Sequence, residues 1–218
     1  MTAICRYISK MPKDTTMEKF CIGISSYIND IYRENNVDME QLKHNPVMRM
    51  TASAIVYSRY LRQIWMVGDC QCMVNGVAYD NPKPHEKETA GERAAIIRTA
   101  IDNGVSIEEL MTDDIGRKAI LPKLKEACLL QNILFPVIDG FDIPTDKVKV
   151  VDINEGPTEI VLASDGYPIL MESLEKSEKE LKRLIKHDPL CIKENVATKG
   201  LAYGQSSFDD RSYIRFND

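Results

Sequence analysis

Short connections between strand-like runs constrain the fold of this chain more than any other feature. The segments 51–58, 62–69 and 71–79 are rich in apolar and β-branched residues, and only a few residues separate them. A parallel pair needs a crossover of about a dozen residues or more, so these runs predict antiparallel strands. Asn75-Gly76, inside the third run, is typical of a hairpin turn.

Helical and strand-like segments alternate along the rest of the chain. Apolar residues recur at spacings of three and four over 15–35, which predicts a helix. We predict further helices over 85–103, 106–130 and 168–186, and Pro122 either kinks the helix over 106–130 or starts a new one. Further strands are predicted at 133–138, 147–153, 158–164 and 211–216, and the stretch 188–206 has no period and predicts a long loop. The expected fold class is α+β, a layered sandwich of antiparallel sheets flanked by helices, in a single domain over residues 1–218.

Charge and hydropathy argue against several classes of function and location. The formal net charge is −5, which argues against nucleic-acid binding, and 44% hydrophobic residues suffice for a substantial core. No run of about 20 apolar residues occurs, and the first residues are too few and too polar for a secretory signal. We therefore expect a cytoplasmic protein without membrane contact. Its six cysteines are expected to be reduced thiols.

Three strings set acidic residues beside strand-like runs: IWMVGDCQC at 64–72, IVLASDGYP at 160–168 and SFDDRSYIRF at 207–216. Asp69 and Asp165 end such runs, and Asp209 with Asp210 opens one. Carboxylates at strand edges are what a hard divalent cation requires, and such an ion can activate water for attack on a phosphate.

Each string taken alone is also typical of an ordinary turn. Asp165-Gly166 after a strand, Gly68-Asp69, and the adjacent acids Asp209-Asp210 all fit solvated or hairpin turns. If the last strand pairs antiparallel with 158–164, however, Asp165 and Asp209 share one edge, and a cation would relieve their repulsion. Gly166 would then allow close approach of backbone and ligand, while Asp210 caps or orients.

Together, and in this order, the strings resemble those of the metal-dependent protein phosphatases of type 2C. The residues that carry the resemblance are Gly68-Asp69-Cys70, Ser164-Asp165-Gly166 and Asp209-Asp210. The likeness extends from about residue 15 to 216 and implies hydrolysis of phosphoserine or phosphothreonine monoesters, with a phosphorylated protein or a small phosphoester as partner. It also implies two Mg²⁺ or Mn²⁺ ions held by Asp165 and Asp209, and Asp69 as ligand of a third, weaker metal.

The chain departs from that family pattern in two places. Cys70 replaces the usual serine, and no Asp-Gly-x-Gly-Gly string occurs. In the family this string supplies the Asp that bridges both metals and often the histidine regarded as general acid, so no catalytic residue is identified here. Asp139-Gly140 comes in the wrong order and predicts a turn. The chain is thus expected to be N-terminally incomplete relative to the family: a truncated gene product, a misplaced start, or a domain that has lost catalysis.

Three functional interpretations remain open from the sequence. One is a metal-dependent phosphatase with weak or no turnover, and another is a pseudophosphatase that binds a partner. A third is a homo-oligomer formed through an open sheet edge. His44, His85 and His187 are interpreted as surface or capping residues, and Lys199-Gly200 either meets a phosphate or is solvated.

Overall fold

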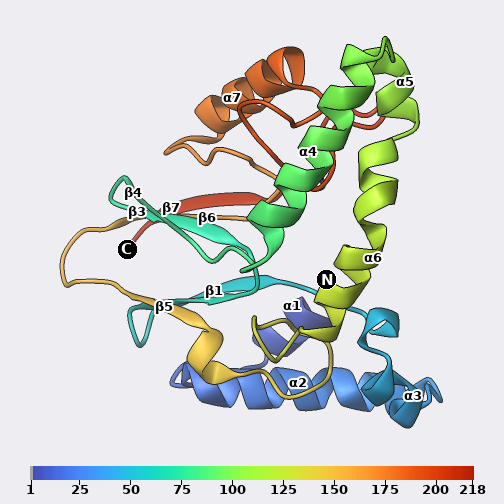
Figure 1. Cartoon of the computed structure of the whole chain (residues 1–218). Helices are drawn as coiled ribbons and strands as arrows, with labels where there is room; N and C mark the ends of the chain where they lie inside the picture. The colour runs from blue at the N-terminus through green and yellow to red at the C-terminus, as the bar shows by residue number, and fades with distance from the viewer. Residues whose placement is uncertain (1) are drawn as a thin grey trace.

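Two antiparallel sheets face each other at the centre of the computed structural model, which describes residues 2–218 (Figure 1). The first sheet has the order β1-β2-β5, with β1 at Ala54–Ser58, β2 at Gln63–Val67 and β5 at Lys149–Asp152. The second has the order β4-β3-β6-β7, with β3 at Gln71–Val74, β4 at Val77–Asp80, β6 at Glu159–Ala163 and β7 at Tyr213–Asn217. The strands of both sheets pair antiparallel, which confirms the predicted α+β sandwich.

Helices cover both outer faces of the sandwich and one side of it (Figure 1). α1 (Thr2–Ile8) and α2 (Met17–Glu34) lie below the first sheet, with α3 (Met39–His44) and a short 3₁₀ turn (Pro46–Met48) following α2. α7 (Leu174–His187) lies above the second sheet, and α4 (Glu86–Asp102), α5 (Ile107–Thr112) and α6 (Ile115–Leu129) stand beside the sandwich. A second 3₁₀ turn (Thr145–Lys147) leads into β5.

Burial on both faces explains why the strands are apolar without clear alternation. In β2, Trp65 and Val67 pack in the cluster formed with α2, while Ile64 and Met66 pack between the two sheets. β6 divides its side chains in the same way, with alternate residues facing the first sheet and α7. Successive strand side chains point to opposite faces, so each central strand contributes to two core layers.

Two strand predictions were wrong. Residues 133–138 form no strand and contribute only isolated bridges, Gln131 with Phe135 and Ala52 with Ile138. The consecutive runs 62–69 and 71–79 do not pair with each other, because the chain crosses from the first sheet to the second between β2 and β3. The third run is instead the β3–β4 hairpin, turned at Asn75-Gly76 as predicted.

The helix predictions hold with two corrections. The stretch 106–130 is divided at Asp113-Asp114 rather than at Pro122, because the Asp114 carboxylate accepts a hydrogen bond from the Arg117 backbone N–H (2.7 Å) and caps α6. Pro122 remains inside α6. α7 starts at Leu174, capped by Ser173, and not at residue 168. The stretch 188–206 contains no helix or strand, as predicted.

Strand β7 lies at an edge of its sheet, and within residues 2–218 it pairs only with β6. Its Ile214 is 56% exposed. Association of two copies through this edge remains a prediction, as does the single-domain organisation. None of the helices over residues 2–218 has the length and apolar character needed to cross a membrane.

Candidate functional site: a carboxylate cleft at one end of the second sheet

The register of the second sheet brings the three predicted aspartates to one end of it. Ala163, the last residue of β6, pairs with Gln71 at the start of β3 and with Tyr213 at the start of β7. Asp69 precedes β3, Asp165 follows β6 and Asp209 precedes β7, so all three lie just beyond this shared end. They line one cleft of about 670 Å³.

The backbone turn that carries Asp165 is fixed by close packing. The Gln71 side-chain amide donates hydrogen bonds to the carbonyl oxygens of Ser164 (2.9 Å) and Tyr167 (2.6 Å). A side chain at Gly166 would collide with the Asp210 carbonyl, so glycine allows the two segments to touch. The close approach seen at Gly166 joins two parts of this chain, and the approach of a ligand to Gly166 remains a prediction.

Asp69 is held by two partners. Its Oδ1 accepts a hydrogen bond from Ser53 Oγ at 2.6 Å, and its Oδ2 is 2.5 Å from Lys83 Nζ. Gly68 makes the first contact possible, because its positive φ of 87° and missing Cβ leave room for Ser53. Asp69 is thus an anchored, ion-paired carboxylate rather than a free turn residue.

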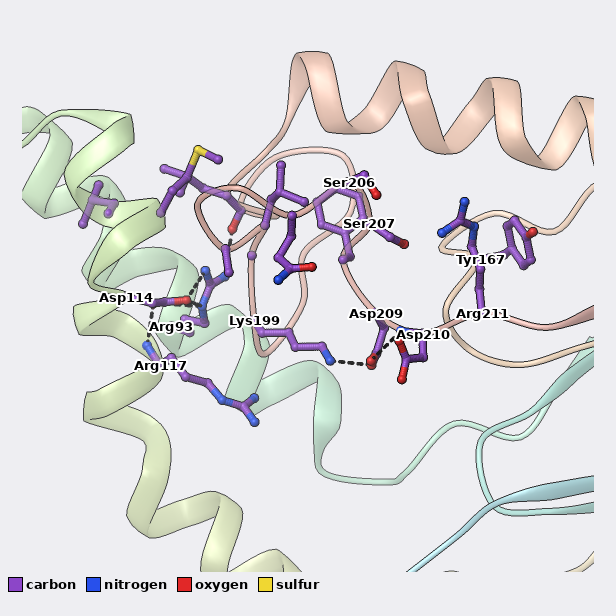
Figure 2. A pocket seen from close by; sticks show the side chains of 18 of the residues that line it. Arg93, Asp114, Arg117, Tyr167, Lys199, Ser206, Ser207, Asp209, Asp210 and Arg211 are labelled. Atoms are coloured by element: carbon purple, nitrogen blue, oxygen red, sulfur yellow. Dashed lines mark hydrogen bonds and ion pairs between the residues drawn. The ribbon is translucent and has the colours of Figure 1, made fainter. Parts of the chain in front are cut away.

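Asp209 is paired in a similar way, as Figure 2 shows. Its Oδ2 accepts a hydrogen bond from Lys199 Nζ, and its Oδ1 accepts one from the Asp210 backbone N–H at 2.9 Å. Asp210 therefore supports Asp209 through its main chain. The Asp210 side chain is absent from the lining of the carboxylate cleft and lines a neighbouring one instead.

The cleft carries an excess of negative charge. Its lining includes five carboxylates and three lysines, namely Asp69, Asp80, Glu86, Asp165, Asp209, Lys83, Lys87 and Lys199. A phosphate dianion entering this cleft would meet net repulsion unless additional positive charge accompanied it. The charge balance favours a cation over an anion as ligand.

The electrostatics single out Asp165. Burial, together with the charges of Asp69 and Asp209, raises the pKa of Asp165 to about 6. For Asp69, burial alone would raise the pKa, but the charge and hydrogen bond of Lys83 outweigh burial and lower it. Among residues 2–218, Asp165 is the one of the three aspartates without an ion-pair partner. The negative charge of Asp165 is therefore the least compensated of the three.

The donors have the right chemistry for Mg²⁺ or Mn²⁺, since both ions prefer carboxylate oxygens. Their arrangement does not fit a bound ion, however. Over residues 2–218, no three His, Cys, Asp or Glu side chains gather closely enough to hold a metal. Lys83 and Lys199 also occupy oxygens of Asp69 and Asp209 that an ion would need. The structure brings the three predicted ligands together, and their metal role remains a prediction.

A larger cleft of about 1080 Å³ adjoins the first and shares Tyr167, Lys199, Phe208 and Asp209 with it (Figure 2). Its wall is built around Arg93, which is fully buried in α4 and paired with Asp114 at 2.7 Å. Arg93 also donates to the carbonyl oxygens of Leu190 (2.9 Å) and Ala197 (3.1 Å). This arginine fastens the long loop to the helices beside the sheets.

The other sequence candidates lie elsewhere or are inert. Burial, then the charges of Asp69 and Asp165, raise the pKa of the Cys70 thiol to about 12, so it stays protonated and is a poor nucleophile. None of the three histidines lines the carboxylate cleft. Asp139 lies on a bend, as predicted, but it is fully buried and ion-paired with Arg49 at 2.9 Å. It is therefore a structural residue.

Sequence reasoning missed the role of the two lysines. Lys83 stands between Pro82 and Pro84, 14 positions after Asp69, and no local pattern links the two residues. Lys199 was interpreted as either phosphate-binding or solvated, whereas it is paired with Asp209.

Comparison with solved structures finds similar folds. One is the catalytic domain of the serine/threonine protein phosphatase PstP in complex with two manganese ions, at 13% identity and a TM-score of 0.38, over 100% of this chain and 77% of that one. Another is the Mycobacterium tuberculosis serine/threonine phosphatase PstP/Ppp, at 14% identity and a TM-score of 0.39, over 99% of this chain and 78% of that one. At these values the similarity is remote, so the function has to be inferred from the cleft itself. No protein-family model and no curated protein matches the sequence.

Proposed function

We propose that this protein is a phosphatase-like domain of the metal-dependent type, with the carboxylate cleft as its site for phosphomonoesters. The observation that carries the proposal is the convergence of Asp69, Asp165 and Asp209 from three separate segments into one cleft. The proposed partner is a phosphorylated protein or a small phosphoester, since divalent ions held by carboxylates can polarise a phosphoryl group and activate water to attack it. The cytoplasmic location remains a prediction of the sequence.

Turnover is proposed to be weak or absent. Two of the three aspartates are neutralised by lysines, and the lining of the cleft contains no histidine as a general acid. With Lys83 and Lys199 bound as they are, a Mg²⁺ or Mn²⁺ pair has no complete set of ligands. Over residues 2–218, the cleft therefore offers no group for efficient general-acid catalysis.

The second candidate is a catalytically dead domain that binds a partner. The observation in its favour is the adjoining cleft of about 1080 Å³, which is large enough for several side chains of a polypeptide. Its ordered wall depends on Arg93 and the long loop rather than on the carboxylates. A binding domain of this kind would keep its affinity for a partner without any metal.

The two candidates are separated by hydrolysis and binding assays on the same preparations. A phosphoserine peptide and p-nitrophenyl phosphate are incubated with the protein and Mn²⁺, with Asp165→Asn and Asp209→Asn as variants. The control is Asp30→Asn, a change at an exposed position of α2 that lies outside the cleft lining. Slow Mn²⁺-dependent hydrolysis that both cleft variants abolish supports the phosphatase, whereas robust hydrolysis unaffected by either variant contradicts it. Peptide binding without hydrolysis favours the dead domain.

A further inference from the structure

Two lysines from different segments enter the carboxylate cleft, and each bonds a predicted metal ligand. We propose that Lys83 and Lys199 are resident cations that take the place of divalent ions in this cleft. Removing their charges should then free the carboxylate oxygens that a divalent cation needs. The inference rests on the proposed function only in that both concern the same cleft.

Lys83 is built into position. It lies between Pro82 and Pro84, which restrict its backbone, and the neighbouring Asn81 amide donates a hydrogen bond to the Gly68 carbonyl at 3.1 Å. The side chain is 30% exposed and its partner Asp69 only 12%.

Lys199 is positioned by the two residues before it. Arg93 binds the carbonyl oxygen of Ala197, and Arg117 binds that of Thr198 at 2.9 Å. Both arginines belong to helices, so the loop that presents Lys199 is fastened to rigid elements. Lys199 is 43% exposed, but its backbone is tied down on this side and its ammonium group reaches Asp209 (Figure 2). It is a placed charge rather than a freely solvated one.

An ammonium group and a hard cation compete for the same carboxylate oxygens. A divalent ion needs several oxygen ligands at about 2.0–2.6 Å, whereas each lysine already holds one oxygen of Asp69 or Asp209. An incoming ion must therefore displace both ammonium groups and lose the energy of two ion pairs. The native chain should bind Mg²⁺ and Mn²⁺ only weakly for this reason.

The test is calorimetric titration of Mn²⁺ into the native protein, Lys83→Met, Lys199→Met and the double variant, at neutral pH. Methionine is close to lysine in length and carries no charge. We expect the double variant to bind Mn²⁺ at least about tenfold more tightly than the native protein. Adding Asp165→Asn to the double variant should abolish the gain, because Asp165 would be a ligand. Bound Mn²⁺ should also raise the melting temperature of the double variant and not that of the native protein.

Lys123→Met is the matched control, because Lys123 pairs with Glu92 at similar exposure to the Lys199–Asp209 pair but lies outside the cleft. It should leave Mn²⁺ affinity unchanged. Tight binding of Mn²⁺ by the native protein overturns the inference, and so does a folded double variant with native affinity. If the double variant does not fold, Lys199→Met decides: tighter binding supports the inference and unchanged binding overturns it.

The same data keep the two proposals apart. Efficient Mn²⁺-dependent hydrolysis by the native protein would overturn both the proposal of weak turnover and the inference that the two lysines replace divalent ions. Absence of hydrolysis together with a double variant that gains no metal affinity would overturn the lysine inference alone. A gain in metal affinity without any hydrolysis would support the inference and favour the dead domain.

Discussion

The backbone carbonyl of Asp210 fills the space that a side chain on Gly166 would need. This contact locks the turn after β6 against the segment before β7, and it sets Asp165 beside Asp209 in one cleft. The contact is backbone against backbone, so a neighbouring side chain cannot swing away to relieve a clash. The geometry of the cleft therefore depends on a residue without a side chain.

Gly166→Ala should destabilise the protein by about 1–3 kcal/mol, the usual cost of forcing an extra carbon into a packed site. Chemical denaturation measures the change. Gly91→Ala is the opposite case, since Gly91 lies within α4 and nothing lies within 4 Å of an added Cβ. That change should stabilise by about 0.5–1 kcal/mol. Equal effects of the two changes would contradict the role assigned to Gly166.

The sequence predicts that Asp165 and Asp209 lie at one edge of the sheet, but it does not predict that lysines pair with the aspartates of the cleft. Antiparallel pairing of 158–164 with the last strand, together with the strings around Asp165 and Asp209, was enough to place both aspartates at one edge. Those relationships follow from strand register. The pairing of Lys83 with Asp69 depends on how a proline-flanked loop folds back toward the sheet. The periodicity of apolar residues, from which helices and strands are predicted, does not determine the path of a loop.

The same distinction explains the wrong strand at 133–138. Its composition favours a strand, yet the segment leads into Asp139, which collects hydrogen bonds from Gln131 (3.0 Å), Asn132 (2.8 Å) and the backbone of Phe141 (3.0 Å). Satisfying a buried carboxylate outweighs local β-propensity. Such a network joins Arg49 to Asp139 across 90 positions and leaves no local pattern in the sequence.

Removing that buried charge should be costly. Asp139→Ala leaves Arg49, 8% exposed, without its carboxylate and removes an acceptor of the Gln131 and Asn132 side-chain amides, so we expect a loss of about 3–5 kcal/mol in the free energy of unfolding. Asp146→Ala removes an exposed pair with Lys147 and should change stability by less than about 0.5 kcal/mol. Urea denaturation of the two variants side by side measures the contrast, and a small loss for Asp139→Ala would show that Arg49 finds another partner.

The pKa of about 6 for Asp165 predicts an unusual dependence of stability on pH. Between about pH 4 and about pH 6 the folded state binds more protons at this group than the unfolded state, so the contribution of Asp165 to stability falls as the pH rises. Asp165→Asn removes this loss. The variant should melt at a higher temperature than the native protein at pH 7 in chelator, and the advantage should disappear at about pH 4. Because part of the raised pKa comes from the charges of Asp69 and Asp209, the difference should shrink with added salt. An advantage that is the same at both pH values would contradict the raised pKa.

A buried carboxylate, Asp188, organises the first part of the long loop after α7. Asp188 is 1% exposed and accepts backbone N–H groups from four following residues, namely Ile192 (2.9 Å), Lys193 (2.9 Å), Glu194 (2.9 Å) and Asn195 (3.1 Å). Asp188→Ala leaves these donors unpaired, so their amide hydrogens should exchange faster, while those of β6 keep native rates.

This loop also presents Lys199 to Asp209, so loosening the loop should weaken the Lys199–Asp209 ion pair and its competition with Mn²⁺ for the carboxylate. Hydrogen exchange followed by mass spectrometry, with Glu194→Ala as a surface control, tests the first effect. Native protection of residues 192–195 in Asp188→Ala would show that Arg93 and Arg117 suffice to hold the loop.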